Sequence, residues 1–167
     1  MKTDSLQRAI LGGCAATAVL IVLMYLAPFA GLPRTDMASV IGGFLGEPVM
    51  TFAPGWWIGF AVFILVGGVI SPVLYAYARA MLFGSGWQRG VEWGLLLWTF
   101  GGVCVMVHLG LGFHEPFVSH PHLSALMSVL AHVAYGAVLG AVCGIVKEAP
   151  VAAPPGTEAG PAVTPAR

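Results

Sequence analysis

The chain alternates between long apolar stretches and short segments that hold most of its charged residues. Four apolar stretches stand out, at about residues 9–30, 56–78, 91–112 and 123–146. Each is long enough to cross the hydrocarbon core of a bilayer as a helix, which takes about 20 residues. The pattern therefore predicts an all-α, polytopic membrane protein with four transmembrane helices in two hairpins.

A shorter periodic segment lies in the connection between the first two predicted spans. Thr35 or Asp36 supplies an N-cap, Gly46 precedes the breaker Pro48, and the apolar residues between them recur at helical spacing: Met37, Val40, Ile41, Phe44 and Leu45. We expect a short helix over about residues 36–46. It would lie in the outer membrane interface or pack as a lid over the mouth of the bundle.

The two ends of the chain add little to the predicted membrane domain, residues 9–146. Residues 1–8 form a short N-terminus whose Lys2 and Arg8 resemble the start of a signal peptide. The apolar run that follows is about twice the usual length for such a peptide, so we expect an uncleaved span. Residues 147–167 are rich in Pro, Ala and Gly, which predicts a disordered tail.

Composition agrees with the hydrophobic pattern. Hydrophobic residues make up 58% of the chain and charged residues 8%, with a mean hydropathy of +0.89, whereas a soluble domain has about 25% charged residues. This composition excludes a large soluble domain and points to the lipid bilayer as the main partner. The sequence has no basic stripe of the kind that binds nucleic acid.

The positions of the cationic residues predict the orientation. Five of those that flank the predicted spans lie on the side of the two termini: Lys2, Arg8, Arg79, Arg89 and Lys147. Only Arg34 lies on the opposite side. By the positive-inside rule both termini should be cytoplasmic. Tryptophans should mark the two interfaces, Trp56 and Trp57 outside and Trp87 and Trp93 inside.

Glycine spacing predicts close helix packing. Gly136, Gly140 and Gly144 repeat every four residues, and two shorter versions occur at Gly55 with Gly59 and at Gly90 with Gly94. Such spacing lines one helix face with hydrogen and lets another backbone approach. We expect packing within one subunit. The alternative is a face for self-association or for docking into a larger membrane complex.

All five histidines lie in one part of the chain, which the predicted topology turns outward: His108, His114, His120, His122 and His132. His108 and His132 fall below the outer surface, on two antiparallel neighbouring spans, so both can face one crevice. The other three histidines and Glu115 would cap this crevice. Asp36 and Glu47, on the first outer connection, would add carboxylates across its mouth.

Several roles are open to this candidate site. Imidazole and carboxylate together suit a transition metal, and His108 with His132 would ligate haem b if they reached equal depth, although their predicted depths differ by about 6 Å. A protonation role is another alternative. The structural alternative is that a buried His132 makes a hydrogen bond to a neighbouring helix and has no further role. The sequence holds no nucleophile and base at a recognisable spacing, so we expect no enzyme activity.

Four stretches carry a family resemblance: GWWIGFAVF, GWQRGVEWGLLLW, HLGLGFHEP and LAHVAYGAVLGAVCG. The most distinctive element is H-x-x-Y-G-x-x-x-G, formed by His132, Tyr135, Gly136 and Gly140. Together they resemble a widespread family of small four-span bacterial membrane proteins of unknown function, and more distantly an inner-membrane group linked to acid resistance. The resemblance implies a four-span fold and an inner-membrane location, and it supplies no reaction.

We therefore expect a non-catalytic accessory or structural membrane component with an outward-facing His-rich crevice. One alternative is a small redox subunit that binds a metal or haem b. The other is a protein that responds to external pH and takes part in acid tolerance, since imidazoles gain charge as the outside acidifies.

Overall fold

The computed structural model describes residues 3–32, 36–44, 51–105 and 121–144, and all the regular structure in these ranges is helical. The α-helices are α1 (Thr3–Leu26), α2 (Met37–Phe44), α3 (Pro54–Leu65), α4 (Ser71–Ala78), α5 (Gly86–Leu97) and α7 (Pro121–Gly144). A π-helical turn, Val66–Ile70, joins α3 to α4, and a second π-helical segment, Trp98–Val105, continues α5. Short 3-10 turns follow α1 at Ala27–Ala30 and α4 at Arg79–Met81.

Three helical stretches within the described ranges are long and apolar enough to cross a membrane. They cover Ser5–Ala30, Pro54–Met81 and Ala125–Gly144, with 26, 28 and 20 residues. At about 1.5 Å per residue even the shortest matches the thickness of a hydrocarbon core of about 30 Å. These stretches correspond to the first, second and fourth predicted spans. The third, 91–112, is helical from Gly86 to Val105, and residues 106–112 lie outside the described ranges.

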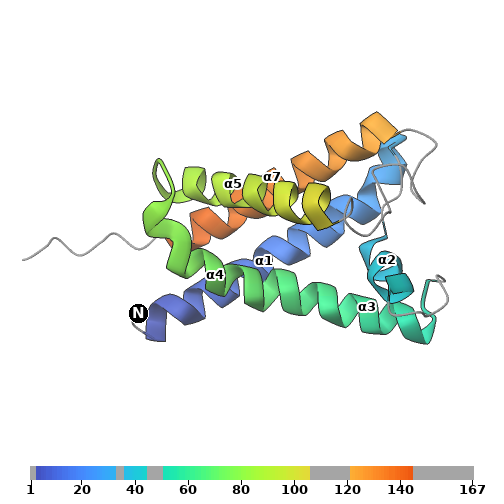
Figure 1. The fold of residues 1–167 in the computed structure, drawn as a ribbon, viewed down its shortest axis with the longest axis horizontal. Helices are drawn as coiled ribbons and strands as arrows, with labels where there is room; N and C mark the ends of the chain where they lie inside the picture. Colours follow the sequence, from blue (N-terminus) through green and yellow to red (C-terminus); the bar gives the residue numbers. More distant parts are fainter. Residues whose placement is uncertain (1–2, 33–35, 45–50, 106–120, 145–167) are drawn as a thin grey trace, which may run out of the picture.

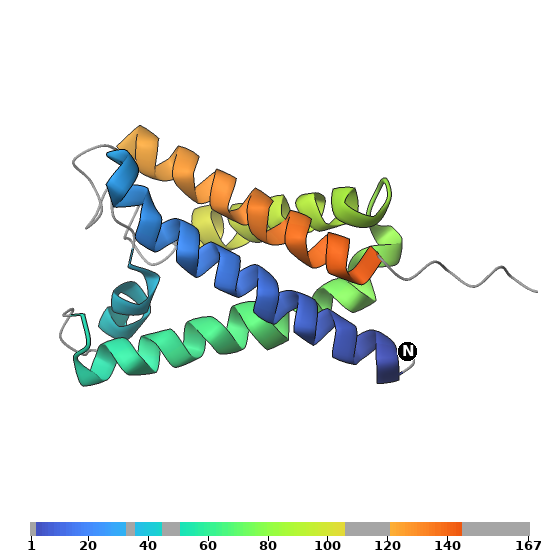
Figure 2. The same cartoon turned by 180° about the vertical axis from the view of Figure 1, so that it is seen from behind.

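The helices form an elongated bundle (Figure 1). α5 packs along α7, and α1 runs between this pair and the rod formed by α3 and α4, as the view from behind also shows (Figure 2). The start of α1, the connection from α4 to α5 and the end of α7 lie at one end of the bundle. The end of α1, the short α2 and the starts of α3 and α7 lie at the other end.

α2 occupies the place where the amphipathic pattern predicts a helix, and it packs on the first turns of α3. Asp36 is its N-cap, because the Asp36 carboxylate accepts the backbone N–H of Ser39 at 3.2 Å. A Cβ at Gly42 would overlap the carbonyl oxygen of Gly55, and one at Gly59 would overlap that of Ala38. Only glycine therefore allows the two backbones to approach this closely.

Side chains in the bundle are sorted by size. The buried face of α1 is made of small residues and one leucine: Ala9, Gly12, Gly13, Ala16, Thr17 and Leu20. Its exposed face carries larger apolar side chains such as Leu11, Val19 and Val22. Exposed large apolar residues also occur along α3, α4, α5 and α7. Small residues inside and large apolar residues outside are what helices packed in lipid require, since lipid tails are as apolar as leucine.

Candidate functional site

The second membrane-compatible helix is broken near its middle, where α3 passes into α4. The backbone N–H of Ser71 donates to the carbonyl of Val66, five residues back, which is the π-helical pattern. The next residue, Pro72, has no N–H. The carbonyl of Gly67 therefore loses the Ser71 N–H that would serve it in a regular α-helix, and it cannot receive one from Pro72.

Tyr135, from α7, supplies the missing donor. Its hydroxyl donates to the Gly67 carbonyl at 2.6 Å and lies 3.0 Å from Ser71 Oγ. A tyrosine hydroxyl has one proton, so Ser71 must provide the proton of the longer contact. The indole N–H of Trp93, on α5, donates in turn to Ser71 Oγ at 3.1 Å. These residues form a hydrogen-bonded chain that joins α5, α4 and α7 at the break, and we call it the Tyr135 chain.

α1 closes the same break from the other side. The thiol of Cys14 lies 3.8 Å from the Gly68 carbonyl as a weak donor. The hydroxyl oxygen of Thr17 lies 2.7 Å from the position that a Cβ on Gly67 would take. A Cβ on Gly13 would overlap the ring of Pro72. The break is thus enclosed by residues that touch its backbone directly, and Tyr135, Ser71 and Thr17 are all buried.

The predicted glycine face of α7 is in contact with α5. A Cβ on Gly90 would overlap the carbonyl oxygen of Gly136, and one on Gly94 would overlap that of His132. Gly140 and Gly144 meet the backbone of Gly86 in the same way, at 2.7 and 2.8 Å from the position of a Cβ. Because α5 occupies this face, another copy of the chain can use it only if α5 leaves.

His132 lies on α7 one turn before Tyr135 and is partly buried. Its Nδ1 is 2.8 Å from the carbonyl oxygen of Ser128, in the preceding turn of the same helix. A carbonyl only accepts, so Nδ1 carries the proton and Nε2 of the neutral ring has the lone pair. His132 thus has a hydrogen bond within its own helix, where the sequence left a bond between helices as one of the alternatives.

The other predicted site residues are only partly covered by the structure. Asp36 caps α2 and accepts the indole N–H of Trp56 at 3.0 and 3.1 Å, so it is bonded within the α2 and α3 pair. His122 lies in the first turn of α7, but its side chain is not among those described. The remaining candidates fall outside the described ranges: Glu47, His108, His114, Glu115 and His120. Among the described side chains, no three of His, Cys, Asp and Glu come together as ligands for a metal.

The two outer tryptophans have different environments. Trp57 is 54% exposed, as an interfacial residue should be, whereas Trp56 is 4% exposed and hydrogen-bonded to Asp36. Trp93 also turns inward, to Ser71, although the sequence suggested an anchor at the inner interface. Trp87 is exposed.

Sequence comparison places the chain in a family. The model of DUF6789, a family of unknown function, matches residues 3–153. The chain belongs to this family. The region matched in DUF6789 runs from α1 through α7 and so includes the broken helix, the Tyr135 chain and the glycine contacts. No curated protein and no solved structure matches the chain.

The Tyr135 chain was not among the site residues expected from the sequence. Two signals for it were present: Ser71 next to Pro72, which marks a helix break, and the distinctive H-x-x-Y-G of α7. The sequence could not pair them, because Tyr135 and Gly67 are 68 positions apart. The clustering of the histidines instead predicted a site whose residues lie mainly outside the described ranges.

Proposed function

We propose that the protein is a structural or accessory component of a bacterial inner membrane, with four spans and both termini in the cytoplasm. The observation that carries this proposal is the Tyr135 chain. Its polar groups bond one helix to another at a broken span, so they serve to hold a defined helix arrangement in an apolar surrounding. The exposed large apolar residues on α1, α3, α5 and α7 support a lipid environment for that arrangement.

The proposed orientation is supported by the described arginines. Arg8 lies near the start of α1, Arg79 follows α4 and Arg89 lies in the first turns of α5. These segments share one end of the bundle (Figure 1). The opposite end carries Asp36. A single cationic end is expected on the cytoplasmic side.

Extraction and a C-terminal reporter test the membrane placement. The full chain should stay in the membrane pellet after alkaline carbonate washing, and a reporter fused after Arg167 should be active only in its cytoplasmic form. A soluble chain after washing would refute membrane integration. An external reporter would refute the cytoplasmic C-terminus.

A replacement of His132 separates the structural role from a pH-responsive one. In a strain that lacks the protein, the His132→Gln variant should support survival as well as the parent does across a range of external pH. The reason is that glutamine keeps a donor for the Ser128 carbonyl. Loss of rescue at low external pH alone, with normal amounts of protein in the membrane, would favour the pH-responsive role.

A further inference from the structure

A pocket lies at the cationic end of the bundle, away from the predicted histidine crevice. It is small, it opens to the outside, and it is lined by residues of three helices and the turn after α4: Ser5, Ala9, Tyr75, Ala76, Arg79 and Cys143. The pocket sits where α1 starts and α7 ends, which is the level of the lipid headgroups if these helices cross the membrane.

Tyr75 gives this pocket an unused polar group. The residue is 2% exposed and its ring packs on Trp93, with the ring centroids 6.0 Å apart. Its hydroxyl makes no hydrogen bond with any described residue, although Tyr75 lines the pocket. A hydroxyl at the pocket that has no protein partner can donate to a ligand with an acceptor oxygen.

The charge around the pocket favours an anionic ligand. Arg79 lines it, and both Arg79 and Arg89 are close enough to act electrostatically on Tyr75. The Nε atom of Arg89 is buried and has no hydrogen-bond partner among the described residues. Glu92, a described carboxylate at this end, accepts the backbone N–H of Phe83 at 2.7 Å. Guanidinium groups bind phosphate through paired N–H donors, which makes phosphate a suitable ligand.

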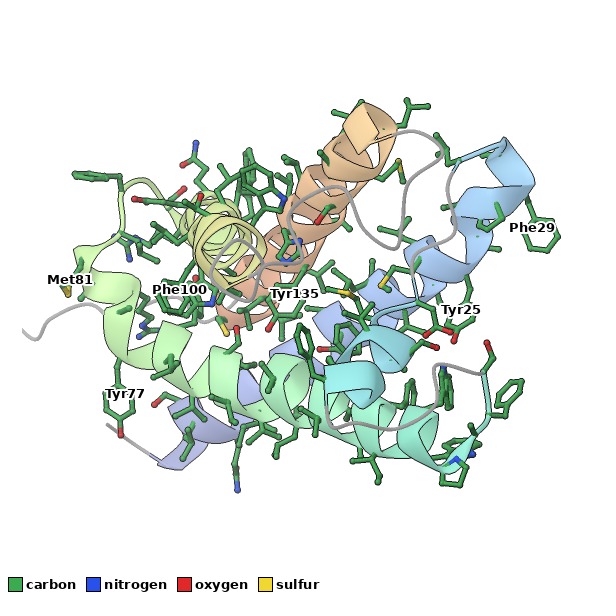
Figure 3. All side chains as sticks on the ribbon, turned by 45° about the vertical axis from the view of Figure 1, so that its right-hand side comes forward. Tyr25, Phe29, Tyr77, Met81, Phe100 and Tyr135 are labelled. Atoms are coloured by element: carbon green, nitrogen blue, oxygen red, sulfur yellow. The ribbon has the colours of Figure 1, made fainter. Side chains whose placement is uncertain are left out.

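We propose that this pocket binds the phosphate group of an anionic glycerophospholipid such as phosphatidylglycerol, with Arg79 and the Tyr75 hydroxyl as donors. Basic pockets between spans on the cytoplasmic side are where such headgroups are held. The residues beside the pocket suit the rest of the lipid. Leu74 is exposed on α4, and Tyr77 and Met81 project away from the bundle at this end (Figure 3). The inference rests on the membrane placement proposed above.

Lipid titration of the purified full-length chain tests the site. Native mass spectrometry in a neutral detergent would count bound dioleoyl phosphatidylglycerol against its concentration. Arg79→Gln should weaken binding about tenfold, the loss typical of one charge-assisted hydrogen bond. Tyr75→Phe should weaken it about threefold. Arg8→Gln is the matched control, because Arg8 is an exposed arginine at the same end that does not line the pocket, and it should stay within about twofold of the parent.

The other outcomes would overturn the proposal. Equal losses for Arg79→Gln and Arg8→Gln would mean diffuse surface charge, and no loss for Arg79→Gln would remove the site altogether. Equal binding of phosphatidylcholine would contradict selection for an anionic lipid, and displacement by inorganic phosphate at matching concentrations would contradict a lipid ligand. Any of these results, with the chain still in the carbonate-washed membrane, would leave the proposed membrane function intact. Arg79 is exposed, so its variant should fold even if Tyr75→Phe does not.

Discussion

Tyr135→Phe isolates the contribution of the Tyr135 chain, because it removes one oxygen and keeps the ring. The change deletes the bonds at 2.6 and 3.0 Å and leaves the Gly67 carbonyl without its donor. No backbone donor can replace it, since the Ser71 N–H is bonded to Val66 and Pro72 has none. Leaving a buried acceptor unsatisfied costs about 1–3 kcal/mol in proteins.

The membrane environment lowers the upper limit of this expected cost. Side-chain hydrogen bonds between membrane helices contribute about 0.6 kcal/mol on average and about 1.7 kcal/mol at most, because the unfolded chain in lipid also finds partners. Two bonds are lost here and one carbonyl has no substitute donor, so we expect the upper part of that range. The free energy of unfolding should fall by about 1–1.5 kcal/mol.

The assay is titration of the purified chain from neutral micelles into dodecyl sulfate, with helix content followed by circular dichroism. Tyr77→Phe is the matched control, because Tyr77 lies on α4, the helix that follows the break, and is 67% exposed. It should change the free energy of unfolding by less than about 0.5 kcal/mol. If Tyr135→Phe were as mild as Tyr77→Phe, the hydrogen-bonded chain would not stabilise the break and our reasoning would be wrong.

Three further predictions follow from the packing. Gly90→Ala should lower the free energy of unfolding by about 2 kcal/mol or more in the same titration, because its Cβ would overlap the Gly136 carbonyl, while Gly101→Ala, whose Cβ would meet no atom of the described residues within 4 Å, should have no destabilising effect. Equal effects of these two variants would contradict the close contact of α5 with α7. Asp36→Ala should speed amide exchange in residues 37–44 about fivefold, because it removes the N-cap of α2, and should leave α7 unchanged; uniform exchange in both helices would argue against this. Ser71→Ala combined with Tyr135→Phe should show a coupling of at least about 0.5 kcal/mol in a double-mutant cycle, and additive effects would mean that the two hydroxyls act separately.

Much of the fold could be predicted because lipid imposes simple local rules. Long apolar stretches predicted four spans, and three of them are helices long and apolar enough to cross. Glycine spacing predicted that backbones approach closely at Gly136 and Gly90. The sequence also predicted that the third and fourth spans are neighbours, but only the structure shows that the glycine face of α7 meets Gly90 and Gly94 of α5. The role of Tyr135 was hidden for a similar reason. A π-helical turn depends on where one main-chain bond shifts, and the side chain that satisfies the released carbonyl comes from a distant helix.

The histidine cluster shows the opposite situation. Its residue types predicted a ligand set or a proton-responsive site, and that prediction stays open for the residues outside the described ranges. His132, which the structure does describe, bonds to the Ser128 carbonyl in its own helix. Asp36, predicted to lie across the mouth, caps α2 and accepts from Trp56. Residue type alone could not distinguish these local hydrogen bonds from ligation of a metal.

Sidedness is the most direct test of the central claim, that this is a membrane bundle with its cationic end in the cytoplasm. Two single cysteines, Thr51→Cys between α2 and α3 and Ser85→Cys before α5, would be introduced in a chain whose three native cysteines are replaced. Intact cells would then be treated with a membrane-impermeant maleimide. We predict labelling at position 51 and protection at position 85 until the membrane is opened. Labelling of both positions in intact cells, or of position 85 alone, would contradict the account.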